Sequence, residues 1–169
     1  YHDVVAADPT CKTRMIPAWR PDAAMNIEAA TFKAYVEKLS AVSGVEIKTF
    51  ADMIAALQKR HDFFASKGCK LSDHGIEEFY AEDYTSAEIE AIFAKVYGGA
   101  MLTDSELRKY KSAMLVEFGI MDWETGWTQQ FHFGVIRNNN SRKMASIGVD
   151  TGFDSIGDFT LAKNMAKYL

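Results

Sequence analysis

Cysteine is scarce in this sequence of 169 residues, which holds only Cys11 and Cys69. Two cysteines are too few for a disulfide framework or a cysteine-rich zinc module. Long hydrophobic runs are also absent, because the apolar stretches span a handful of residues, whereas a membrane-spanning helix needs about 18–20. The first residues lack the pattern of a signal peptide. We therefore expect a cytoplasmic protein that does not contact a membrane.

Basic residues are also fewer than acidic residues. The sequence has 19 Lys and Arg against 23 Asp and Glu, which gives a formal net charge of -4. No basic run is present, so we expect no nucleic-acid partner. The glycine-rich phosphate loops, the G-x-S-x-G elbow and the H-E-x-x-H zinc motif are missing as well. These absences disfavour nucleotide-dependent enzymes and two common classes of hydrolase.

The overall composition is that of one ordinary folded domain. Hydrophobic residues make up 48% and charged residues 25% of the sequence, which are average values for a globular protein. Both ends read as interrupted, because no Met precedes Tyr1 and no capping residue follows the helical pattern that reaches Leu169. We therefore expect residues 1–169 to be one segment of a longer chain.

Three segments have the pattern of buried strands, and helical patterns lie between them. The predicted strands are 14–19, 69–72 and 127–136, the first interrupted by Pro17. The predicted helices are 32–39, 49–68 with Gly68 at its end, 85–98, 103–118 and 159–169, the last capped by Asp158. Thr85 with Glu88 and Thr103 with Glu106 have the spacing of a capping box.

This alternation predicts an α/β protein with a parallel sheet. The connections are longer than those of a bare βαβ unit, which needs about 30 residues, so they carry inserted helices. Three such units cannot close a (β/α)8 barrel, which takes about 250 residues. The chain is therefore either a small open sheet or a partial (β/α)8 barrel of three parallel strands, and its interrupted ends favour the partial barrel.

Each predicted strand leads into a polar cluster. These clusters are 19–22 (WRPD), 72–75 (SDHG), and 129–132 (QQFH) followed by 137–140 (RNNN). In parallel α/β folds the loops after the strands converge on one crevice, so these side chains are candidates for a common active site. An Arg suits a substrate carboxylate, an Asp can transfer a proton, and a neutral His can bind a metal.

Structural interpretations of the same residues stay open. Arg20 and Asp22 could form a local ion pair, Asp73 could cap a helix, and His74 could lie exposed in a loop. His132 could be a hydrogen-bonded interior histidine. The three asparagines at 138–140 are typical of a turn, and we expect His61 and Cys69 to be structural.

Four motifs resemble those of the uronate isomerases, also called glucuronate isomerases. Residues 16–22 (IPAWRPD) with 25–28 (MNIE) resemble the WRPD segment, and 68–74 (GCKLSDH) resemble the GC(K/R)-x-SDH segment. Residues 126–132 (GWTQQFH) with 137–140 (RNNN) resemble the GW-x-QQ-x-H and RNNN run, and 150–156 (DTGFDSI) resemble the D-x-GFDSI segment. The motifs occur in order over nearly the whole sequence.

The resemblance implies a metal-dependent (β/α)8 barrel of the amidohydrolase superfamily, of which 1–169 would be the central part. Its reaction interconverts D-glucuronate and D-fructuronate, and likewise D-galacturonate and D-tagaturonate. Asp73 and His132 are implied as catalytic, with His132 also at the metal. The implied substrate-binding residues are Trp19, Arg20, Asp22, Gln130 and Arg137, with Arg20 as the clamp for the carboxylate. A zinc or manganese ion in the full-length enzyme and a homo-oligomer are implied as well.

One departure from the family limits what this chain can do alone. The His-x-His pair of the family's first strand and the Asp of its last strand, its principal metal ligands, have no counterpart among His2, His61, His74 and His132. One histidine cannot hold a catalytic metal that takes about three protein ligands. We therefore expect the isolated chain to be inactive and to bind no metal. A hydrolase of the same superfamily and a non-catalytic α/β interaction module are the alternatives.

Overall fold

The computed structural model describes residues 2–169. Its helices are α1 (His2–Ala7), the 3-10 helix η1 (Asp22–Ala24), α2 (Phe32–Ser43), α3 (Phe50–Ser66), α4 (Ser86–Tyr97), α5 (Asp104–Thr125), α6 (Ser141–Ile147) and α7 (Ala162–Tyr168). Its strands are β1 (Leu71–Ile76), β2 (Thr128–Phe133), β3 (Val135–Ile136) and β4 (Ser155–Ile156). Within 2–169, none of the helices has the length and apolar character that crossing a membrane requires.

The expected parallel sheet is present, but its first strand is shorter than predicted. Strands β1 and β2 pair in parallel from Leu71 opposite Thr128 to Ile76 opposite Phe133. Segment 14–19 does not form a strand and contributes one parallel bridge, between Trp19 and Ser72. Proline has no backbone N–H to donate to a ladder, so Pro17 prevents a longer pairing.

The other two predicted strands are shifted. Strand β1 begins two residues later than predicted and extends to Ile76, while Cys69 packs in the core before it. Strand β2 ends at Phe133 because Gly134 takes a positive φ of 78°, a conformation that favours glycine. Beyond it, β3 pairs antiparallel with β4, so the predicted strand 127–136 divides between two sheets.

Helix starts agree closely with the sequence patterns. Thr49, Thr85 and Thr103 each cap a helix through a complete capping box. The last predicted helix is present as α7, but its predicted start and cap are wrong, because it begins three residues after 159 and its N-cap is Leu161, without a side-chain cap from Asp158. Helices α1 and α6 were not predicted, and neither has a buried residue.

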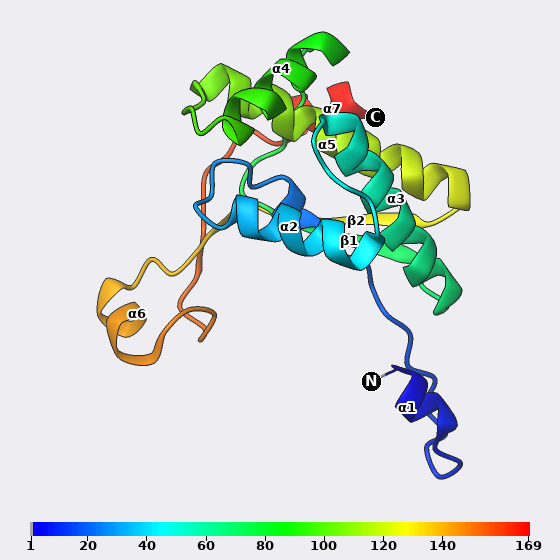
Figure 1. Cartoon of the computed structure of the whole chain (residues 1–169). Helices are drawn as coiled ribbons and strands as arrows, with labels where there is room; N and C mark the ends of the chain where they lie inside the picture. Colours follow the sequence, from blue (N-terminus) through cyan, green and yellow to red (C-terminus); the bar gives the residue numbers. More distant parts are fainter. Residues whose placement is uncertain (1) are drawn as a thin grey trace.

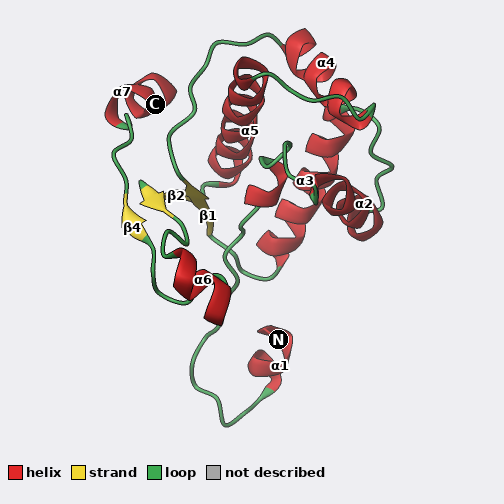
Figure 2. Cartoon of the chain, turned by 90° about the vertical axis from the view of Figure 1, so that its left-hand side faces the viewer, coloured by secondary structure: helices red, strands yellow, loops and turns green. Residues whose placement is uncertain are grey.

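The helices gather on one side of the sheet. Figures 1 and 2 show α2, α3, α4 and α5 grouped together beside β1 and β2, with α1 and the α6 segment projecting away. The core between helices and sheet includes fully buried Phe118, Tyr110 and Met114 of α5. The hydroxyl of Tyr110 donates to the carbonyl of Ala24 at 3.1 Å and so ties η1 to α5. This contact fixes the segment that follows Trp19 beside the ends of the strands.

Candidate active site

Alternation along the two strands separates the polar residues onto two faces. Successive side chains of a strand point to opposite faces, and in β1 the buried residues are Ser72 and His74. Asp73 and Gly75 therefore lie on the face away from the helices. Gln130 and His132 of β2 lie on that same face, since Asp73 pairs with Gln130 and Gly75 with His132. The helix-free face thus carries the predicted catalytic residues.

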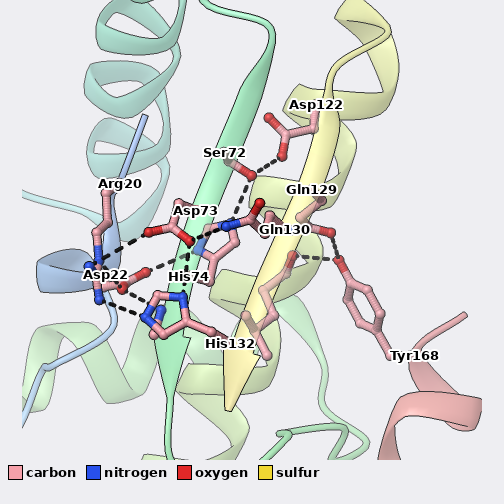
Figure 3. Close-up of polar contacts among 12 residues, drawn as sticks. Arg20, Asp22, Ser72, Asp73, His74, Asp122, Gln129, Gln130, His132 and Tyr168 are labelled. Atoms are coloured by element: carbon pink, nitrogen blue, oxygen red, sulfur yellow. Dashed lines mark hydrogen bonds and ion pairs between the residues drawn. The ribbon is translucent and has the colours of Figure 1, made fainter. Parts of the chain in front are cut away.

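Asp73, His132 and Arg20 form a hydrogen-bonded cluster on this face (Figure 3). The Asp73 carboxylate accepts from Nε2 of Gln130 and from Nδ1 of His132, both at 3.0 Å. Nη1 of Arg20 lies 3.6 Å from the same carboxylate, and its Nη2 lies 3.3 Å from Nε2 of His132. Because the guanidinium can only donate, Nε2 accepts and the imidazole is neutral with its proton on Nδ1.

Gly75 makes room for this cluster. A Cβ added there would overlap Nη2 of Arg20 and lie 2.6 Å from Nε2 of His132, closer than real Cβ contacts come. Both functional groups therefore cross directly over the backbone of β1, and glycine is needed for this close approach.

Asp22 holds the cluster from the side. Its carboxylate accepts from Nε of Arg20 at 3.0 Å, from the backbone N–H of Gly75 at 2.8 Å and from Nδ1 of His74 at 3.0 Å. Burial by itself would raise the pKa of Asp22, but the hydrogen bonds from His74, Gly75 and Arg20 outweigh it and hold that pKa below its usual value. The predicted local ion pair of Arg20 and Asp22 is confirmed.

A second group of polar residues lies between the strands and α5, on the buried face. His74 is fully buried, so the interpretation of an exposed loop residue is wrong. Its Nε2 lies 3.0 Å from Oγ of Ser72, which lies 2.5 Å from Oδ2 of Asp122. Oδ1 of Asp122 lies 3.2 Å from Nε2 of His61. His61 and Cys69 are buried in the core, as expected for structural residues.

Within the cluster, His132 lines a cleft of about 280 Å³. Asp22, Gly75, His132 and Arg137 line it, together with Asn26, Glu28, Tyr80 and Lys111. Nζ of Lys111 pairs with Glu28 at 2.5 Å, and its ammonium lies 5.3 Å from the centre of the Tyr80 ring. Sequence reasoning did not select these last four residues. Asn26 and Glu28 belong to a quoted motif, whereas nothing in the sequence singled out Lys111 or Tyr80.

Two predicted substrate-binding residues have other partners. The Trp19 side chain is 4% exposed and packs edge-on against Phe118 and His61, which does not fit a substrate contact. Successive side chains of an extended segment point to opposite faces, so Trp19 points into the core while Arg20 points to the open face. Arg137 lines the cleft, but its Nη1 is bound by Asp154 at 2.9 Å and Asp150 at 3.3 Å.

Asp73 lies within β1, so the alternative that it caps a helix is wrong. His132, which the sequence also allowed as an interior histidine, keeps 40% of its side chain exposed. Gln130 is exposed and donates a hydrogen bond to Asp73.

The described residues do not form a metal site by themselves. Between residues 2 and 169 there is no group of three His, Cys, Asp or Glu side chains that could hold an ion, whereas a catalytic metal takes about three protein ligands. Nε2 of His132 faces the Arg20 guanidinium, and its Nδ1 is bound by Asp73. A positive guanidinium at this position repels a divalent cation. The residues present therefore do not fit a complete metal centre.

Comparisons with known proteins agree on one family. The family described as glucuronate isomerase matches residues 1–169. Uronate isomerase from Bacteroides thetaiotaomicron is 71% identical over 157 residues, which cover 92% of this chain and 34% of the relative. Uronate isomerase from Cellvibrio japonicus is 52% identical over 170 residues, covering 100% of this chain and 36% of the relative. The chain thus spans about a third of the length of these relatives.

Two solved structures share the fold. Uronate isomerase from Thermotoga maritima aligns with a TM-score of 0.88 at 31% identity, over 95% of this chain and 36% of that one. Glucuronate isomerase from Caulobacter crescentus aligns with a TM-score of 0.86 at 26% identity, over 99% and 35%. These alignments confirm the α/β fold with parallel strands expected of a partial barrel. By its sequence along its whole length, the chain belongs to the glucuronate isomerase family.

Proposed function

We propose that residues 1–169 form the central segment of a uronate isomerase barrel and supply part of its active site. The reaction interconverts D-glucuronate and D-fructuronate, and D-galacturonate and D-tagaturonate. The observation that carries this proposal is the cluster of Asp73, His132 and Arg20, of which His132 lines a cleft at the ends of parallel strands, where (β/α)8 enzymes have their active sites. Because the chain spans a third of its relatives, the activity belongs to the whole protein.

The cluster has the parts needed for proton transfer between neighbouring carbons. His132 is neutral, and its Nδ1–H is held by Asp73, which fixes the orientation of the ring and stabilises the imidazolium that forms when Nε2 accepts a proton. When a sugar oxygen accepts a hydrogen bond from Nη2 of Arg20, Nε2 of His132 loses its bond to Arg20 and becomes free to accept a proton. His132 then removes the proton from C2 of the aldose and returns it to C1, through an enediolate, while the proton of the C2 hydroxyl passes to the oxygen on C1.

The position of Arg20 bears on which end of the sugar it contacts. Arg20 adjoins His132, whereas the carboxylate carbon and C1 are the two ends of the substrate, roughly 6 Å apart across five C–C bonds of about 1.5 Å. One site cannot hold both ends at once. We propose that Arg20 contacts oxygens at the reacting end and that Arg137, whose hydrogen bonds within residues 2–169 all use Nη1, binds the carboxylate with its remaining donors.

The expected zinc or manganese ion would take its principal ligands from parts of the whole protein outside these residues. We further propose that the whole protein acts in the cytoplasm, as a homo-oligomer, on a free sugar acid. Gln130 would keep Asp73 in place, and Asp22 would hold Arg20.

The decisive experiment replaces the matching segment of the Bacteroides thetaiotaomicron uronate isomerase by this chain. At 71% identity we expect the chimera to fold and to convert D-glucuronate to D-fructuronate. His132→Ala and Asp73→Ala in the chimera should lower kcat by about 10²-fold or more. Arg20→Ala should chiefly lower kcat, and Arg137→Ala should chiefly raise KM. If Arg20→Ala instead chiefly raises KM and Arg137→Ala chiefly lowers kcat, then Arg20 rather than Arg137 binds the substrate carboxylate.

Product analysis distinguishes the alternatives. A hydrolase of the same superfamily would release two products from an ester or amide and leave glucuronate unchanged. A folded chimera that retains the parent enzyme's metal content and still fails to isomerise would favour a non-catalytic module. The isolated 169-residue chain should show no turnover, and turnover would contradict the proposed division of the active site.

A further inference from the structure

We propose that His74 is a positioning residue of the cleft: a buried, doubly protonated imidazole that fixes Asp22 and, through Asp22, orients Arg20. The expected effect of His74 on the kinetics rests on the proposed isomerase function, whereas the protonation of His74 does not. His74 is 0% exposed, so it cannot touch a substrate and can act only through its neighbours.

The surroundings of His74 leave its ring one orientation. The ring stacks on Phe118 at a centroid distance of 5.2 Å and an interplanar angle of 13°, and Phe131 lies 5.4 Å away on β2. Nδ1 reaches Oδ1 of Asp22, and Nε2 reaches Oγ of Ser72, each at 3.0 Å. Turning the ring would break both hydrogen bonds inside the core, where unpaired polar groups are costly.

The neighbouring groups determine where the protons are. Asp122 accepts on both oxygens, from Ser72 and from His61. The Ser72 proton therefore points to Asp122, and its oxygen accepts from Nε2–H of His74. His61 donates through Nε2, while its Nδ1 has no partner among the described residues, so His61 is neutral.

The other nitrogen of His74 also carries a proton, because it faces the Asp22 carboxylate, which can only accept. The charged groups around His74 are Asp22, Asp122 (through Ser72) and Arg20, which binds the other oxygen of Asp22, and the rings of Phe118 and Phe131 pack against the imidazole. The arrangement is an imidazolium between two carboxylates, a pairing that a buried charge requires.

This arrangement places the two oxygens of Asp22 in different roles. Oδ1 is held by His74, which leaves Oδ2 to accept from Gly75 N–H and from Nε of Arg20. Arg20 is thereby turned so that Nη2 reaches His132. Without the bond to Oδ1, the Asp22 carboxylate could rotate about its side chain, and Arg20 would lose its fixed orientation.

His61 provides a matched control. It is as buried as His74 and bonds Asp122, the carboxylate that accepts from Ser72, but it stacks on Trp127 at 3.9 Å and makes no contact with Asp22. Replacing either histidine by Gln removes a buried ring and leaves a donor near the position of Nε2. Only replacement of His74 also frees Asp22.

Two substitutions of His74 separate its two hydrogen bonds. In His74→Asn the amide NH2 lies near the position of Nδ1 and can still donate to Asp22, whereas in His74→Gln it lies near the position of Nε2 and can donate to Ser72. In the active chimera, we expect His74→Gln to lower kcat/KM for glucuronate by about 10- to 100-fold. His74→Asn should recover most of that loss, and His61→Gln should stay within about twofold of the unmodified chimera.

Denaturation midpoints separate positioning from stability. Both Gln variants are expected to lower the midpoint by similar amounts, because each removes a buried ring. Equal losses of kcat/KM in His74→Gln and His61→Gln, or a greater loss in His74→Asn than in His74→Gln, would overturn the positioning role.

A spectroscopic measurement tests the protonation without using activity. In the ¹⁵N-histidine-labelled 169-residue chain at pH 7, with resonances assigned from the His74 variants, we expect protons on both nitrogens of His74 and on one nitrogen of His61. A singly protonated His74 would overturn the proposal. If the unmodified chimera fails to isomerise glucuronate, the proposed function fails, and the His74 spectrum still decides its protonation.

Discussion

Asp22→Asn tests the hydrogen bonds that join the strand ends to the segment after Trp19. The substitution exchanges one oxygen for NH2 and removes the charge. The remaining carbonyl oxygen can still accept from His74, but the NH2 then faces the N–H of Gly75 and Nε of Arg20, which are donors. We expect an unpaired Gly75 N–H to cost about 1–3 kcal/mol. The half-exposed Arg20 contact adds about 0–1 kcal/mol, so the free energy of unfolding should fall by roughly 1–4 kcal/mol.

The effect should depend on pH in a definite direction. The pKa of Asp22 in the folded chain lies below its usual value, because the hydrogen bonds from His74, Gly75 and Arg20 outweigh its burial. A carboxyl group with a lowered folded pKa contributes its full stability above the unfolded pKa, about 3.9 for Asp, and loses it as the pH falls through the folded value. The Asp22 contribution to the difference between the parent and the variant should therefore shrink as the pH falls from about 5 to 3.5.

Urea denaturation of both chains at pH 7, 5 and 3.5 measures this difference. Asp3→Asn is the control, since Asp3 is exposed and pairs with Lys67 at the surface, and it should change stability little. The reasoning would be refuted by an Asp22→Asn chain as stable as the parent at pH 7. A difference that grows as the pH falls from 5 to 3.5 would refute it equally.

Three further predictions concern a cap, the core and the site. Thr85→Ala should lower the free energy of unfolding by about 1 kcal/mol, whereas Thr31→Ala should not, because Thr31 makes no side-chain cap bond. Urea denaturation of the two variants compares these free energies, and equal effects would contradict the capping argument. Phe118→Ala should cost about 3–5 kcal/mol by the same measurement, far more than Phe63→Ala at a 45% exposed position. Gly75→Ala should displace the ends of the Arg20 and His132 side chains. It should lower kcat of the chimera by about tenfold or more with little change in the melting temperature. An unchanged kcat would count against the close approach of these side chains to Gly75.

Local interactions were readable from the sequence. The starts of α3, α4 and α5 at Thr49, Thr85 and Thr103 follow from capping boxes, because a capping box involves residues three apart and forms wherever a helix begins. The alternation of strand and helix patterns predicted a parallel sheet, and the ordered motifs predicted the family. The strand ends that carry Asp73 and His132 were also predicted from local patterns, because each polar cluster directly follows its strand along the sequence.

The sequence could not assign a strand's two faces to the core and to the cleft. Alternation separates Asp73 from His74, but which of them is buried depends on the side against which α5 packs. The same choice sends Trp19 into the core and Arg20 to the face that carries His132.

Long-range partners were equally hidden. Lys111 of α5 reaches Glu28, and Arg137 meets Asp150 and Asp154. Local patterns in the sequence predicted where α3, α4 and α5 start, which residue types stand at the strand ends and which family they resemble. Which of these side chains are buried, which line the cleft and which pair with one another followed from the folded arrangement, because those outcomes depend on packing between segments far apart along the chain.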